Sequence, residues 1–90
     1  MTKRHLRGQV TDDIKSATEA VKVFQRSCGT SDDDVIADLI CDLGHLADER
    51  GLDFVNEIRR GIGHWYAEQH VFDGHDLGPD ALVEIIIKPR

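Results

Sequence analysis

Two histidines, each set among carboxylates at helical spacing, are the residues of this 90-residue chain best suited to chemistry. The first group comprises Asp38, Asp42, His45 and Glu49. The second group, nineteen residues later, comprises Glu57, Gly61, His64 and Glu68. Intervals of three and four residues place each group within about 60° on one side of an α-helix. The sequence therefore predicts two helical stripes that each combine an imidazole with carboxylates.

Imidazole and carboxylate side chains together suit a divalent metal ion or a proton transfer near neutral pH. If the two stripes face each other, they form a site for a metal-dependent hydrolase, which is the alternative function. Its ligands would be Asp38, Asp42, His45, Glu57 and His64. If the stripes diverge, they are solvated flanks in which acids stabilise the imidazolium groups. The choice between a site and two solvated flanks depends on the side of the first stripe's helix on which the helix of the second stripe lies. Spacing alone leaves both arrangements open.

No catalytic residue and no cofactor are expected, because the sequence contains no phosphate-binding loop and no identifiable arrangement of serine, histidine and acid. Cys28 and Cys41 are too few for a disulfide framework. Each falls where a small apolar side chain would serve, so we expect two buried, reduced thiols.

Three helices are expected to position these residues, and glycines separate them. The first spans 11–28, where apolar residues from Ile14 to Cys28 recur at intervals of three and four. Thr11 is its expected N-cap, and Gly29 its C-cap. The second spans 32–50 and opens with Ser31 and Asp34, which resemble a capping box.

The third helix spans 54–70 and has Asp53 as its expected N-cap. A connection of only three residues, 51–53, predicts that it packs antiparallel to the second helix as a helical hairpin. Gly61 and Gly63 inside this helix each cost about 1 kcal/mol relative to alanine. They therefore predict either a close approach by another backbone or room for a partner or ligand.

The C-terminal run Ile85, Ile86 and Ile87 favours a β-strand over 82–88, although Gly78, Pro79 and Asp80 could instead open a short helix. A lone strand cannot satisfy its backbone hydrogen bonds, so it needs a partner. That partner is either the segment 5–10 or the same strand of a second copy, which would make a homodimer. The expected fold is one small domain over 1–90, mostly α, with three helices built on the hairpin and this short strand.

The formal charge of −6 is unevenly distributed. Residues 1–30 carry six bases and three acids, and residues 31–90 carry five bases and fourteen acids. Such an acidic surface argues against direct nucleic-acid binding as the main role, since that role needs a dense basic footprint. No apolar run approaches the length of a membrane span, so we expect no membrane partner and a cytoplasmic location.

A DNA-binding regulator is the third function considered, because the turn has the size found in helix-turn-helix motifs. The would-be recognition helix, however, opens with Asp53 and Glu57, which would repel phosphates, and only Arg59 and Arg60 oppose them. The sequence therefore ranks this function below protein binding.

Adjacent aromatic residues mark a second interaction surface on the third helix. Trp65 and Tyr66 point about 100° apart, so only one of them can lie at the centre of the core-facing side. The other would be partly exposed, where it either covers the end of the hairpin or anchors a partner, a role in which Trp and Tyr are favoured. The expected contact patch comprises Arg60, His64, Trp65 and Tyr66.

The middle 40 residues carry a recognisable pattern of the form D-L-x-x-D-L-x-H, then A-D-x-x-G-x-D-F, then H-[YW]. Its residues are Asp38, Leu39, Asp42, Leu43, His45, Ala47, Asp48, Gly51, Asp53, Phe54, His64 and Trp65. This block resembles small proteins of bacterial phages and other mobile elements. The resemblance implies a genomic setting and no mechanism.

That setting favours a small acidic protein that docks on a larger host protein with a basic surface. One example would be an inhibitor of a host defence protein that binds nucleic acid. The leading hypothesis is therefore a noncatalytic protein–protein interaction module. Its expected docking face comprises Asp32, Asp33, Asp34, Asp38, Asp42 and Glu49.

Overall fold

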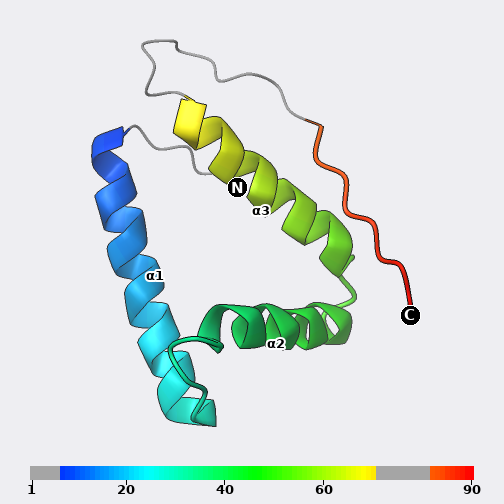
Figure 1. Cartoon of the computed structure of the whole chain (residues 1–90), viewed down its shortest axis with the longest axis horizontal. Helices are drawn as coiled ribbons and strands as arrows, with labels where there is room; N and C mark the ends of the chain where they lie inside the picture. The colour runs from blue at the N-terminus through cyan, green and yellow to red at the C-terminus, as the bar shows by residue number, and fades with distance from the viewer. Residues whose placement is uncertain (1–6, 71–81) are drawn as a thin grey trace.

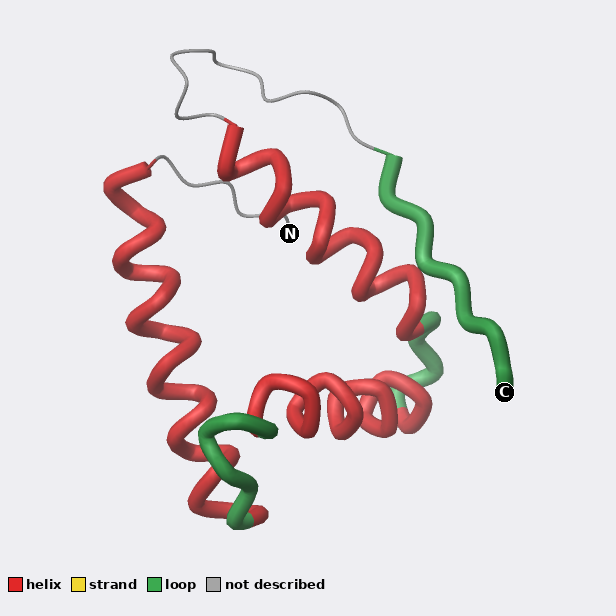
Figure 2. The backbone as a smooth tube through the Cα atoms, viewed as in Figure 1, coloured by secondary structure: helices red, strands yellow, loops and turns green. Residues whose placement is uncertain are grey.

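The computed structural model describes residues 7–70 and 82–90, and the first of these segments forms three helices (Figures 1 and 2). They are α1 (Arg7–Cys28), α2 (Val35–Glu49) and α3 (Phe54–His70). The three helices lie along the sides of an open triangle, with α2 between the other two (Figure 1). The prediction of a mostly α fold with three helices is confirmed.

Helix α1 is longer than predicted, since it begins at Arg7 and not at residue 11. Thr11 therefore lies inside the helix and is not its N-cap. Val10 continues the apolar seam, and it lines a hollow together with Ile14 and Trp65, which explains why the helix extends toward the N-terminus. The C-terminal end is as predicted: Gly29 has a φ of 74°, and its N–H donates to the Gln25 carbonyl at 2.7 Å.

The start of α2 differs from the predicted capping box. Residues 32–34 form a turn and the helix begins at Val35, with Asp34 at the N-cap but without a side-chain cap hydrogen bond. The Ser31 hydroxyl instead donates to Asp34 Oδ2 at 3.1 Å, so it is engaged by the carboxylate and does not cap a backbone N–H. The predicted start at residue 32 was therefore three residues too early.

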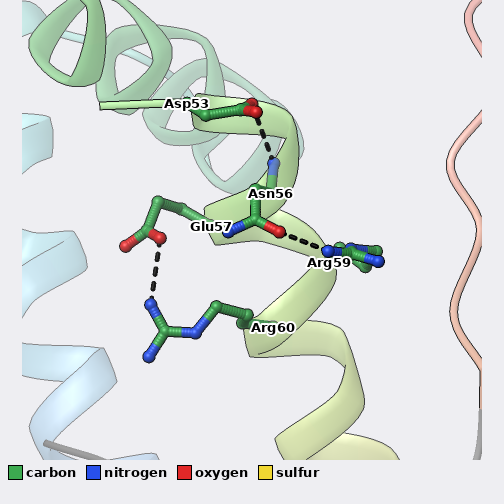
Figure 3. Close-up of polar contacts among 5 residues, drawn as sticks. All are labelled: Asp53, Asn56, Glu57, Arg59 and Arg60. Atoms are coloured by element: carbon green, nitrogen blue, oxygen red, sulfur yellow. Dashed lines mark hydrogen bonds and ion pairs between the residues drawn. The ribbon is translucent and has the colours of Figure 1, made fainter. Parts of the chain in front are cut away.

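The connection between α2 and α3 has the expected local structure. Gly51 has a φ of 71°, and the Leu52 N–H donates to the Ala47 carbonyl at 2.8 Å, which closes the end of α2. Asp53 Oδ1 then accepts a hydrogen bond from the Asn56 N–H at 3.1 Å (Figure 3). Asp53 is thus the N-cap of α3, and the predicted bounds of this helix are confirmed.

Replacing Asp53 by alanine is expected to lower the free energy of unfolding by about 1 kcal/mol, because the Asn56 N–H loses its acceptor. Asp53→Asn is the matched control, since asparagine caps a helix about as well as aspartate. Urea unfolding followed by circular dichroism measures both. Equal losses in the two variants would show that charge, and not the cap, stabilises this turn.

The predicted antiparallel hairpin is not confirmed. Helices α2 and α3 meet at the Gly51 turn and diverge from it (Figures 1 and 2). The Phe54 ring lies directly over Gly44, where an added Cβ would be 3.0 Å from Phe54 Cε2. Farther along, α3 approaches α1, since Trp65 and Gln69 line one hollow with Ile14 and Ala17. These two contacts place α3 along the third side of the triangle, between the end of α2 and the N-terminal half of α1, and not along α2.

Residues 82–90 have no regular secondary structure, so the predicted strand over 82–88 is not confirmed. No strand occurs elsewhere in the described part of the chain to pair with them. This segment instead runs beside α3 (Figure 2), where Val83 Cγ2 lies 4.0 Å from the position of a Cβ at Gly63. Pairing with the strand of a second copy stays a prediction. The other expected partner, the segment 5–10, is not a strand over its described residues, because residues 7–10 belong to α1.

The interior of the triangle is poorly filled. Within residues 7–70 and 82–90, the buried apolar residues are Val35, Ala47 and Ala67, and two of these are alanines. Large apolar side chains on all three helices remain exposed, including Ile14, Ile36 and Trp65. Of the helices in this part of the chain, none is both long and apolar enough to cross a membrane.

Candidate functional site

The stripe on α2 is a solvent-facing row of acids. Asp38, Asp42, His45 and Glu49 are all exposed. Helix α2 contains four acids and neither lysine nor arginine, so its polar side is uniformly acidic apart from the imidazole of His45. Glu49 lies eleven residues from Asp38, which places it about 16 Å farther along the helix axis. The stripe therefore extends over most of one side of α2.

The acidic turn before α2 continues this surface. Asp32, Asp33 and Asp34 are exposed. Neighbouring side chains hold two of them: Gln25 Nε2 donates to Asp32 Oδ1 at 2.8 Å, and Ser31 to Asp34 at 3.1 Å. All six acids of the predicted docking face are thus exposed, and we call this set the acidic face.

A hydrogen bond also fixes the first acid of the helix. The Thr30 hydroxyl donates to Asp38 Oδ2, across the loop between α1 and α2. Asp38 and Asp42 line a hollow of about 300 Å³ beside the end of α1, together with Phe24 and Thr30. The N-terminal half of the acidic face is therefore anchored to α1.

The stripe on α3 has a different environment. Glu57 forms an ion pair with Arg60 at 3.0 Å on its own helix (Figure 3). His64 and Glu68 are half-buried, whereas their counterparts on α2 are exposed. The two stripes thus have the same residue spacing but differ in burial and in their ion pairs.

The five predicted metal ligands are not brought together. Within residues 7–70 and 82–90, no three His, Cys, Asp or Glu side chains are grouped closely enough to hold a metal ion. The reason is that α2 and α3 diverge from the Gly51 turn (Figure 1), and His45 belongs to the first of these helices and His64 to the second. The described geometry therefore gives no support to a metal-dependent hydrolase at these residues.

Replacing His45 and His64 together by alanine is expected to leave the binding of zinc, manganese and magnesium unchanged. The reason is that the two imidazoles belong to separate stripes and form no ligand cluster within the described residues. Titration calorimetry of the variant and the unmodified chain measures this. A zinc affinity that falls at least about tenfold in the variant would show that the two histidines do share a metal.

Both cysteines are exposed, so the expectation of buried thiols was wrong. Cys28 ends α1, Cys41 lies on α2, and both line the hollow beside Asp38. Cys41 Sγ is 3.9 Å from His45 Nε2, one turn along the helix. Helical geometry could have predicted that Cys41 is exposed. It lies two residues from both Leu39 and Leu43, so it points to a different side of α2 from these apolar residues.

The four residues of the second predicted surface differ in exposure and in their partners. Trp65 is 58% exposed and faces the hollow next to α1, whereas Tyr66 and His64 are half-buried. Arg60 lies about 140° from Trp65 around the helix axis and pairs with Glu57. Trp65 is thus the member with the most surface available to a partner.

The arginines at the start of α3 are engaged within their own helix. Arg59 Nη2 donates to Asn56 Oδ1, and Arg60 Nη1 to Glu57 Oε2 (Figure 3). Asp53 and Glu57 are exposed beside them. This helix start therefore presents little free positive charge for the phosphates of DNA.

No protein family, no curated protein and no solved structure matches this chain in the comparisons with known proteins.

Proposed function

We propose that this protein is a noncatalytic protein–protein interaction module that docks on a larger protein through the acidic face. The observation that carries the proposal is a one-sided charge distribution. The twenty residues from Thr30 to Glu49 contain seven acids and neither lysine nor arginine. A uniform field of this kind raises association rates with a basic surface and disfavours acidic partners.

Hydrogen bonds from neighbouring residues support this role. Thr30, Gln25 and Ser31 each donate to one carboxylate of the acidic face. Side chains that are already ordered lose less conformational entropy when a partner binds. The N-terminal half of the face is therefore prepared for binding before the partner arrives.

The resemblance to small proteins of phages and mobile elements supports a host partner. A host protein that binds nucleic acid has a basic groove, because it must neutralise phosphates. An acidic module could occupy that groove and inhibit the host protein. This chemistry favours a defence or other nucleic-acid-binding protein over a partner with an apolar binding surface.

The test is capture from a bacterial lysate on the immobilised chain at about 0.1 M and about 1 M salt, between which the Debye length falls from about 10 Å to about 3 Å. We expect a partner that is retained at the lower salt and released at the higher. Capture of nothing at either salt, or of a partner insensitive to salt, contradicts electrostatic docking.

A further inference from the structure

The two cysteines of the chain lie on different helices but line the same hollow. Cys28 is the last residue of α1, and Cys41 lies inside α2. Both residues are exposed, and both line the hollow of about 300 Å³ beside the end of α1. Buried structural thiols are inert, whereas exposed thiols can be oxidised. The hollow therefore brings together two thiols that are open to chemistry.

Hydrogen bonds hold the surroundings of the two cysteines together. The Thr30 hydroxyl donates to Asp38 Oδ2, across the loop between the helices. Thr30 comes two residues after Cys28. Asp38 comes about one turn before Cys41, on the same side of α2. A disulfide needs Cα atoms within about 7 Å of each other, and because helix ends fray, Cys28 can approach α2 by an adjustment of the last turn of α1 alone.

An imidazole distinguishes one thiol from the other. Cys41 Sγ is 3.9 Å from His45 Nε2, one turn along α2. A neutral imidazole can take up the proton of a thiol, and the thiolate is the form that reacts. Asp38 and Asp42 line the same hollow, and their charges repel an anionic oxidant such as glutathione disulfide but not neutral hydrogen peroxide. We therefore expect Cys41 to react first, and with a neutral peroxide.

We propose that Cys28 and Cys41 form a reversible disulfide when the chain meets a peroxide. The Cys41 thiolate attacks one peroxide oxygen, the O–O bond breaks, and the leaving hydroxide takes up the thiol proton as water, which leaves a sulfenic acid. The Cys28 sulfur then attacks the Cys41 sulfur, so an S–S bond forms and the S–O bond breaks. The second hydroxide leaves as water with the Cys28 proton. Two thiols and one peroxide thus give one disulfide and two waters.

The disulfide would close a ring over residues 28–41. This ring contains four of the six acids of the acidic face, namely Asp32, Asp33, Asp34 and Asp38. A covalent link restricts the conformations of the residues that it encloses. Oxidation would therefore restrain the N-terminal half of the acidic face. The disulfide does not depend on the proposed docking function, because its tests use the chain without a partner.

Treatment of the full reduced chain with a slight excess of hydrogen peroxide is the first test. We expect mass spectrometry to show a single chain that is lighter by two hydrogen atoms and has no thiol left to react with N-ethylmaleimide. Dithiothreitol should restore both thiols. Chains linked to each other, thiols oxidised separately to sulfinic acids, or thiols that stay free would each overturn the disulfide.

Variants test the order of the two steps. Cys28→Ser should accumulate a sulfenic acid that dimedone traps at Cys41, because no second thiol remains, whereas Cys41→Ser should react with peroxide at least about tenfold more slowly. His45→Gln should slow disulfide formation at least about tenfold, because the proton acceptor is lost. His64→Gln, which removes an imidazole from α3, is its control and should react like the unmodified chain. Equal rates within either pair of variants would overturn the roles of Cys41 and His45.

Discussion

Replacing Gly44 by valine will lower the free energy of unfolding by about 2–3 kcal/mol, the largest stability effect that we expect of a single change. A Cβ at this position would lie 3.0 Å from Cε2 and 3.1 Å from Cδ2 of Phe54. Valine adds two methyl groups to that Cβ, so the ring must leave the surface of α2. Because Phe54 opens α3, its displacement would also loosen the junction between the two helices.

Gly61→Val is the matched control for this prediction. Gly61 lies inside α3, and nothing comes within 4 Å of the position of its Cβ. Valine is a slightly better helix former than glycine, so this variant should be neutral or marginally more stable. Urea unfolding of both variants measures the difference, and equal stability changes would mean that Phe54 does not rest on Gly44.

Neutralising three acids of the acidic face will weaken binding of a captured basic partner by about 10- to 100-fold. The changes are Asp33→Asn, Asp42→Asn and Glu49→Gln; none of these side chains forms a hydrogen bond that the described structure uses to hold the fold. Exposed ion pairs contribute up to about 1 kcal/mol each, and about 1.4 kcal/mol is a tenfold change in affinity. Far-ultraviolet circular dichroism should show an unchanged helix content.

The control removes the same charge elsewhere. The control variant combines Asp12→Asn, Glu19→Gln and Glu84→Gln. These three acids are exposed and lie outside the acidic face. Three neutralised acids change the formal charge from −6 to −3 in either variant, so net charge alone cannot distinguish them. Equal losses of affinity would show that the partner senses overall charge and not the acidic face.

Local signals predicted the helix ends well where a residue has a single structural role. Asp53 caps α3, and Gly29 and Gly51 adopt positive φ at the ends of α1 and α2, as their types indicate. Thr11 misled the prediction of the start of α1, because a good N-cap residue can also lie inside a helix when the apolar seam continues past it.

The angle between α2 and α3 could not be predicted from spacing, because a contact between distant residues sets it. The sequence drew attention to Gly61 and Gly63, but the close approach occurs at Gly44, over which Phe54 lies. Gly44, a glycine inside α2, was the available sequence signal for a close approach at this helix. It does not reveal which residue approaches.

The acidic face was predictable because exposure of carboxylates follows from their chemistry. Whether the predicted metal ligands converge could not be predicted, because their convergence depends on the rotation and crossing of two helices. His64 is half-buried and His45 is exposed, so tertiary contacts give different burial to two histidines that have the same spacing from neighbouring acids.

The most direct test of the docking proposal is the dissociation constant of the purified captured partner, measured with the unmodified chain and with both charge variants at two salt concentrations. We predict tight binding by the unmodified chain and the control variant at low salt, and a loss of about 10- to 100-fold for the acidic-face variant. The difference should shrink at high salt, where exposed charges are screened. Equal affinity of all three proteins at low salt would contradict docking through the acidic face.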